Sequence, residues 1–272
     1  MSIVWTDGEL AEAAALLSSE RLAEFLRIAG TERDAVEIHQ LCLSVAGALT
    51  PVVGLLEIAL RNAICRELRE AFGVPDWLTN PPPPFAWKGD EKEKLKQGSA
   101  HARRAVYTKM TGAEKRALDA LAFPSGLPRS ISHEARSKAR QKVIQASTGQ
   151  LIAQLTLFFW KRLFSADYED TLWKRRLRRL FPNKSLSRGI VASHLETLYQ
   201  ARNRVAHHEP ILGVRLVAVL EAVDFMAQEF GSKGPDGQTV VGKMISSYRE
   251  ALNVEADRVM RHVQKFALPP SD

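Results

Sequence analysis

Apolar residues recur at three- and four-residue steps along most of this 272-residue chain, and this spacing restricts the possible folds more than any other feature. Leu10, Ala14, Leu17 and Leu22 follow it within residues 9–28. Such a period places side chains on one face of a helix. We find neither the alternating pattern of a half-buried strand nor an internal repeat. The sequence therefore predicts an all-α protein.

Helix start and stop signals divide the chain further. Gly30 ends the first predicted helix. Thr50 and Pro51 are typical of an N-cap and a first helical residue, so we expect two helices around them, at residues 33–48 and 51–71. Further helices are expected at residues 172–181, 187–208, 212–230 and 240–266.

Four consecutive prolines at residues 81–84 predict an extended segment and the clearest internal boundary. Residues 1–80 are expected to supply N-terminal helices to a bundle. Residues 81–149 would form a basic helical insertion, made of short helices broken at glycines and prolines. Residues 150–272 would complete the bundle, so that all three parts form one composite domain.

Composition favours a protein of the reducing cytoplasm. The two cysteines, Cys42 and Cys65, lie in apolar stretches and indicate neither a disulfide framework nor a zinc site. The N-terminus lacks the pattern of a secretory signal. The uncharged run at residues 41–56 is shorter than the ~20 residues that a bilayer requires, so we expect it to be buried within the protein, with no membrane contact.

The segment Arg202-Asn203-Arg204-Val205-Ala206-His207 carries the chemistry that a function can be argued from. Arg202 falls on the apolar stripe of its helix, which predicts either a buried carboxylate partner or a position at a cleft. Asn203 and His207 are four residues apart and share one side of the helix. His208 is expected to interact with the last helix carbonyls. An arginine and a histidine at this spacing also occur together by chance.

These side chains suit RNA cleavage without a metal, in which the ribose 2′-hydroxyl attacks the neighbouring phosphate. Histidine has an ordinary pKa near 6.5 and can move protons. Arg202 would hold the phosphate, and Asn203 would orient either the histidine or the phosphate. Because one histidine supplies one proton-transfer group, a symmetric dimer that pairs two His207 side chains is expected.

Short patterns elsewhere in the chain also match one known family. They are LEIALRNAI at residues 56–64, FFW at 158–160, LWK at 172–174, FP at 181–182 and LYQARNRVAHHEPI at 198–211. In these segments, which span residues 41–230 apart from much of 91–142, the chain resembles the Abi-like (abortive-infection) branch of the HEPN superfamily. The resemblance implies an all-α helical bundle, dimerisation, and a part in phage defence or a toxin–antitoxin system. It also implies metal-independent ribonuclease activity, with catalytic roles for Arg202 and His207 and with Asn203 beside them.

Glu57 and Arg61 form a charged pair, four residues apart, on an otherwise apolar helix. An internal salt bridge and a functional role are equally compatible with this spacing. In the second case Glu57 would orient Arg202 or Arg61.

Positive charge is concentrated in the middle of a chain whose formal net charge is +7. Residues 97–190 hold nineteen Lys or Arg and six Asp or Glu. In the predicted helix at 172–181, Trp173, Leu177 and Leu180 would pack inward, and the predicted RNA contacts are Lys174, Arg175, Arg178 and Arg179. A second basic cluster occurs at Arg136, Lys138, Arg140 and Lys142. A solvated basic face is the alternative for both.

The leading hypothesis is a ribonuclease with RNA as substrate, no cofactor or metal, a homodimeric site, and a protein or RNA antitoxin. The alternative is a non-catalytic RNA-binding or regulatory HEPN protein. A small-molecule enzyme is disfavoured by the absence of a glycine-rich phosphate loop, a nucleophile elbow or a metal-ligand cluster.

Overall fold

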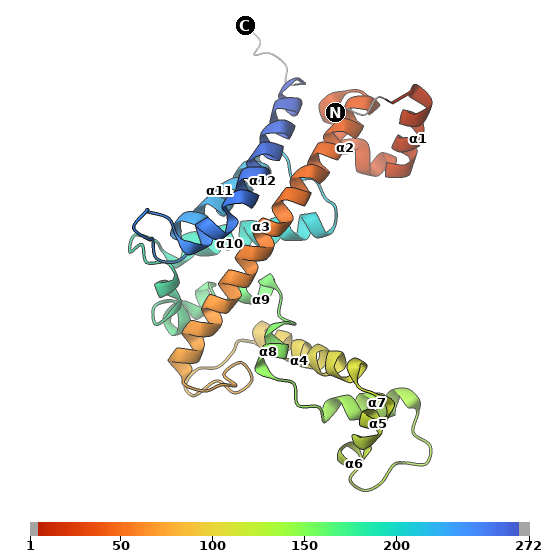
Figure 1. Cartoon of the computed structure of the whole chain (residues 1–272), viewed down its shortest axis with the longest axis vertical. Coiled ribbons are helices and arrows are strands. Elements are labelled where there is room, and N and C mark those ends of the chain that lie inside the picture. The colour runs from red at the N-terminus through yellow and green to blue at the C-terminus, as the bar shows by residue number, and fades with distance from the viewer. Residues whose placement is uncertain (1–4, 267–272) are drawn as a thin grey trace. The chain divides into compact units, whose positions relative to one another are not determined.

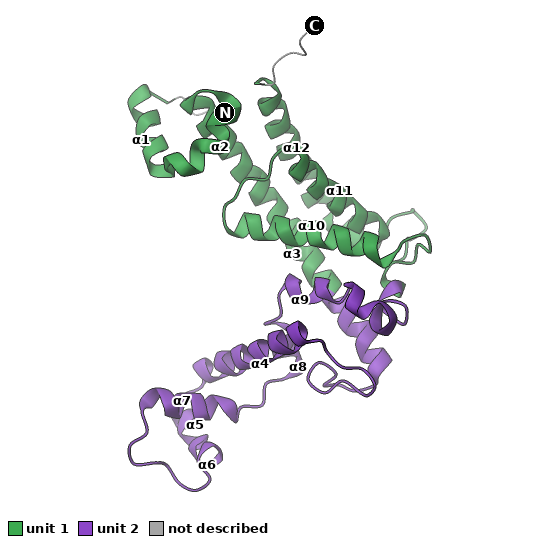
Figure 2. Cartoon of the chain, turned by 180° about the vertical axis from the view of Figure 1, so that it is seen from behind, with its two compact units in different colours: residues 1–60, 179–272 green, residues 61–178 purple. Residues whose placement is uncertain are grey.

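The computed structural model describes residues 5–266, and every named element in that range is a helix (Figure 1). The prediction of an all-α protein is confirmed for this range, in which the one β interaction is an isolated bridge between Lys233 and Thr239. Residues 1–4, on which the expectation about a signal segment partly depends, lie outside it. The chain divides into two compact units, residues 1–60 with 179–272 and residues 61–178 (Figure 2).

The first predicted helix is in fact two, α1 (Asp7–Leu17) and α2 (Ser19–Ala29). Ser18 separates them, because its side chain accepts a hydrogen bond from the Arg21 amide and so caps a new helix. Gly30 ends α2 in the left-handed conformation, as predicted.

The predicted break at Thr50 and Pro51 is wrong, because α3 runs unbroken over Glu32–Phe72. Proline removes the hydrogen bond to the carbonyl four residues earlier. Here that residue is the exposed Gly47, where water can replace the missing donor. The Thr50 hydroxyl donates to the Ala46 carbonyl at 2.7 Å and closes the turn locally. The proline is therefore tolerated inside the helix.

α3 is long and apolar enough to cross a membrane by length and composition alone, a test that the core helix of a soluble protein also passes. Its most buried side chains recur every three or four residues, at Leu49, Val52, Leu56 and Leu60. A one-sided stripe of this kind is typical of a helix packed into a protein core. No feature of α3 clearly marks a membrane protein.

Unit 1 combines the first part of α3 with α10 (Arg188–Ala206), α11 (Val214–Glu229) and α12 (Val240–Gln264). These three helices agree with the predicted ones to within two residues at each end. α11 packs against both α10 and α12. The second crossing is close, since a Cβ on Gly242 would lie 2.6 Å from the Ala227 carbonyl oxygen.

Unit 2 spans residues 61–178, so its ends differ from the predicted divisions at residues 80/81 and 149/150. α4 (Gly89–Lys109) contacts α8 (Thr148–Ile152) and α9 (Leu157–Arg162), so the predicted insertion shares a core with the segment that follows it. α4 is also longer than the short helices expected there. The smaller helices of unit 2 are α5 (Gly112–Ala117), α6 (Asp119–Ala122) and α7 (His133–Lys142).

The proline run of unit 2 leads directly into an aromatic cluster. Phe85, which follows it, contacts Trp87 edge to face at 4.9 Å between ring centroids, and Trp87 contacts Trp77 at 6.1 Å. Trp77 is completely buried. The proline run therefore lies inside unit 2 and adjoins its core, although Pro83 and Pro84 are themselves exposed.

The predicted basic helix at residues 172–181 is irregular. η1 (Ala166–Tyr168) leads into a π turn, η2 (Glu169–Trp173), and a 3-10 helix, η3 (Leu177–Leu180), follows. The Lys174 amide donates to the Glu169 carbonyl, five residues back. This widened turn is compatible with burying Leu172 and Trp173 together with Leu177 and Leu180, the last three as predicted.

Candidate functional site

The helix that carries the arginine–histidine motif begins and packs as its sequence predicts. The Ser187 side chain caps α10 by accepting a hydrogen bond from the Ile190 amide at 3.3 Å. Val191, Leu195 and Leu198 are at most 2% exposed and form the predicted stripe. Arg202 continues the stripe but is exposed. The structure therefore places Arg202 at a cleft, which is one of its two predicted environments.

Arg202 lines a pocket of about 320 Å³ in unit 1. The walls come from α3 and α10: Leu49, Thr50, Val53, Gly54, Glu57, Arg202, Val205 and Ala206. Most of this lining is apolar, and the charged groups are one guanidinium and one carboxylate. Within residues 5–266 the structure records no ion pair or hydrogen bond for either charge, so both can meet a ligand.

Asn203 and His207 lie one step round the helix from the face that lines the pocket. Arg202, Val205 and Ala206 share that face, since residues three and four apart lie one above the other. Asn203 is half-buried and His207 is exposed. His207 is the C-cap, and its amide donates to the Asn203 carbonyl at 3.0 Å. The motif therefore combines a pocket-lining arginine with an exposed histidine at the helix end.

The turn after α10 is held by the second arginine of the motif. Arg204 Nη1 donates to the Pro210 carbonyl at 3.1 Å and lies 3.3 Å from Glu209 Oε2. The Glu209 amide returns a hydrogen bond to the Arg204 carbonyl at 2.8 Å. Arg204 and Glu209 thus position the turn, a role that the sequence analysis did not assign to them.

His208 sits in the left-handed region with φ of 55°, where a side chain other than glycine is uncommon. Its backbone amide, rather than its imidazole as predicted, reaches a helix carbonyl, that of Val205 at 3.1 Å. Arg21 of α2 donates to the His208 carbonyl at 2.6 Å. Arg21 is 187 residues away in sequence, and no local pattern could have indicated this contact.

Of the two alternatives for Glu57, an internal salt bridge to Arg61 is not recorded within residues 5–266, and the Arg61 Nε atom is buried without a hydrogen-bond partner. Glu57 instead lines the pocket with Arg202. The structure therefore places Glu57 in the pocket of Arg202, one of the two arginines that it was expected to orient.

Another histidine of α10 is structural. His194 stacks on Phe225 of α11, with ring centroids 4.1 Å apart. Burial lowers the pKa of His194, against the opposite influence of Glu221. Burial between the two helices therefore favours the neutral form of this ring.

No protein family model, curated protein or solved structure matches this chain. A fold class carries no activity by itself. The function is therefore inferred from the pocket, the turn after α10 and the charges around them.

The four predicted RNA contacts, Lys174, Arg175, Arg178 and Arg179, are all exposed. Lys174 pairs with Asp170 at 2.7 Å, and Arg175 Nε donates to the Asp170 carbonyl at 3.1 Å. The Asp170 carboxylate therefore offsets part of the charge of this segment. The segment remains a basic surface, although a less positive one than the sequence suggests.

The second basic cluster is largely structural. Arg140 donates to both carboxylate oxygens of Asp119 at 2.7 Å, and Arg136 pairs with the same carboxylate. Hydrogen bonds from Arg140 and Arg136 hold the pKa of Asp119 well below its usual range. Lys138 pairs with Glu134 at 2.6 Å. Three of the four cations of this cluster thus have acidic partners, which weakens its case as an RNA-binding surface.

Proposed function

We propose that this protein is a metal-independent endoribonuclease of the HEPN type, acting in the cytoplasm in phage defence or a toxin–antitoxin system. The observation that carries the proposal is that two side chains lie near the same end of α10. One is an arginine with no ion pair recorded within residues 5–266, and the other is an exposed histidine. Arg202 lines the pocket, and His207 caps the helix next to it. An Abi-like helical bundle and a homodimer are parts of the same proposal.

In the proposed reaction the 2′-hydroxyl oxygen attacks the adjacent phosphorus and the bond to the 5′ oxygen breaks. One His207 takes the proton of the 2′-hydroxyl, and His207 of a second copy gives a proton to the leaving oxygen. Arg202 donates to the phosphate oxygens on which negative charge develops. The products are a 2′,3′-cyclic phosphate and a 5′-hydroxyl.

Glu57 places a negative charge in the same pocket, which attracts the Arg202 guanidinium and repels a phosphate that binds there. Its attraction favours an arginine directed into the pocket over one directed into solvent. The apolar residues of the pocket exclude water from a phosphate bound beside them and strengthen its interaction with the guanidinium.

The purified full chain is expected to cleave mixed RNAs in excess chelator. Arg202→Ala should lower the initial rate roughly 100- to 1000-fold, because it removes the donor aimed at the developing charge. Arg215, an exposed arginine of α11, provides the matched control. Equal rates for Arg202→Ala and Arg215→Ala would rule out this role for the pocket.

The alternative function is RNA binding without cleavage, in a regulatory protein. The exposed basic segment at Lys174 and Arg175 favours it, since binding to phosphates requires no proton transfer. Salt-sensitive RNA binding by a dimer that leaves the RNA intact would select this function, whereas failure to bind RNA would contradict both.

A further inference from the structure

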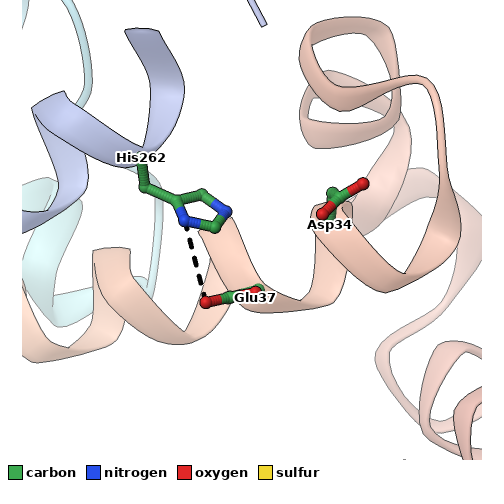
Figure 3. Close-up of side chains that lie close together, drawn as sticks. All are labelled: Asp34, Glu37 and His262. Carbon is green, nitrogen blue, oxygen red and sulfur yellow. Dashed lines mark ion pairs between the residues drawn. The ribbon is translucent and has the colours of Figure 1, made fainter. Parts of the chain in front are cut away.

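Three potential metal ligands meet in unit 1 at the ends of two helices. Asp34 and Glu37 lie near the start of α3, and His262 lies in the last turn of α12 (Figure 3). One ligand atom from each residue lies within 4.8 Å of the others. The two carboxylates are half-buried and the imidazole is buried.

His262 directs an unpartnered nitrogen into this cluster. The residue is 8% exposed, and its Nε2 atom is buried without a hydrogen-bond partner. Figure 3 shows the ring above Glu37, with one nitrogen facing that carboxylate and the other on the side of Asp34. Nδ1 is 3.7 Å from Glu37 Oε1. A buried polar atom without a partner costs about 1–3 kcal/mol, so it calls for a ligand.

We propose that Asp34, Glu37 and His262 bind a divalent transition-metal ion, with Zn²⁺ as the best match. One imidazole and two carboxylates suit Zn²⁺, which binds nitrogen and carboxylate oxygen at about 2.0–2.2 Å. Three protein ligands leave a fourth position for water. In the structure the three donor atoms lie within 4.8 Å of one another, and binding of the ion requires them to move closer together. The side chain of Glu37, which is 41% exposed, has room for this movement.

The two carboxylates favour a bound cation, whereas the ammonium group of Lys265 opposes it. Lys265 Nζ lies 3.5 Å from His262 Nδ1, but it belongs to the C-cap at the end of α12 and its long side chain can turn away. The Thr31 hydroxyl donates to Asp34 Oδ2 at 2.6 Å and leaves Oδ1 for the ion. Arg33 is directed to Asp7 instead. Two carboxylates against one ammonium leave a local excess of negative charge.

This site is separate from the pocket of Arg202 and does not depend on the proposed function. Glu37 precedes Leu49, the first pocket residue of α3, by twelve positions, which corresponds to about 18 Å along the helix. The bound ion would connect the first turns of α3 to the last turn of α12 and stabilise unit 1.

The test is a Zn²⁺ titration of the metal-stripped full chain in competition with a chromophoric chelator. We expect one ion per chain, and we expect His262→Ala, Asp34→Asn and Glu37→Gln each to weaken binding at least about 10-fold. His101→Ala replaces an exposed histidine of α4 and should leave the affinity unchanged. Far-UV circular dichroism identifies any variant that fails to fold, and the half-buried Glu37 allows a mild substitution.

Co²⁺ provides a direct view of the ligands, because its visible spectrum reports coordination. Wild type should give an intense tetrahedral spectrum that Glu37→Gln weakens and His101→Ala preserves. Equal Zn²⁺ affinity in wild type and His262→Ala, or a Co²⁺ spectrum matching that of the hydrated ion, would overturn the proposal. His262 would then interact with Glu37 and Lys265 and bind no ion.

Discussion

Replacing His207 by alanine is expected to lower the rate of RNA cleavage about 10²- to 10⁴-fold, the usual contribution of a positioned acid or base. The imidazole is exposed, and the structure records no side-chain hydrogen bond for it within residues 5–266. The backbone of residue 207 makes the cap through its amide, which alanine retains. The free energy of unfolding should therefore change by no more than about 0.5 kcal/mol.

The measurement is the initial rate of RNA cleavage in excess chelator, together with the urea unfolding midpoint of the same samples. His133→Ala replaces an exposed histidine of unit 2 and serves as the control. If His207 and Arg202 act on one phosphate, the double variant should lose much less than the product of the two separate losses. Full activity in His207→Ala would exclude it as a proton-transfer group.

Replacing Glu91 by alanine should destabilise unit 2 by about 3–5 kcal/mol, because it breaks a buried charge network. Glu91 is 1% exposed and accepts hydrogen bonds from Arg162 Nε at 2.9 Å and from the Tyr168 hydroxyl at 2.7 Å. Burial raises the pKa of Tyr168 above its usual range, so its hydroxyl stays protonated and donates. Alanine would remove the acceptor of the Tyr168 hydroxyl and would leave the Arg162 guanidinium with Asp167, at 2.9 Å, as its remaining partner.

Urea unfolding followed by tryptophan fluorescence measures this effect, since Trp77, Trp87, Trp160 and Trp173 all belong to unit 2. Glu91→Gln keeps an acceptor for Tyr168 and should lose less stability than Glu91→Ala. Glu93→Ala, at an exposed position of the same helix, should change the free energy of unfolding by about 0.5 kcal/mol or less. A midpoint for Glu91→Ala equal to that of Glu93→Ala would contradict a stabilising network.

The helix positions were predictable where the signal is local. The bounds of α10, α11 and α12 follow from apolar spacing and from capping residues such as Ser187. Local signals also produced the errors. Pro51 resembles the start of a helix, yet the apolar face of α3 continues through it. The break at Ser18 is hidden in the sequence because the apolar spacing continues from α1 into α2. In both cases the capping signal and the apolar spacing conflict, and the sequence does not show which of them decides.

The sequence by itself determined the all-α class and placed Arg202, Asn203 and His207 at the end of one helix, because helical periodicity depends on neighbouring residues. Only the tertiary structure decided what those residues meet. It set Glu57 in the pocket of Arg202, Arg21 on the carbonyl of His208, and His262 beside two carboxylates of α3. Such contacts join side chains far apart in the chain, and they depend on how whole helices pack, which no local spacing encodes.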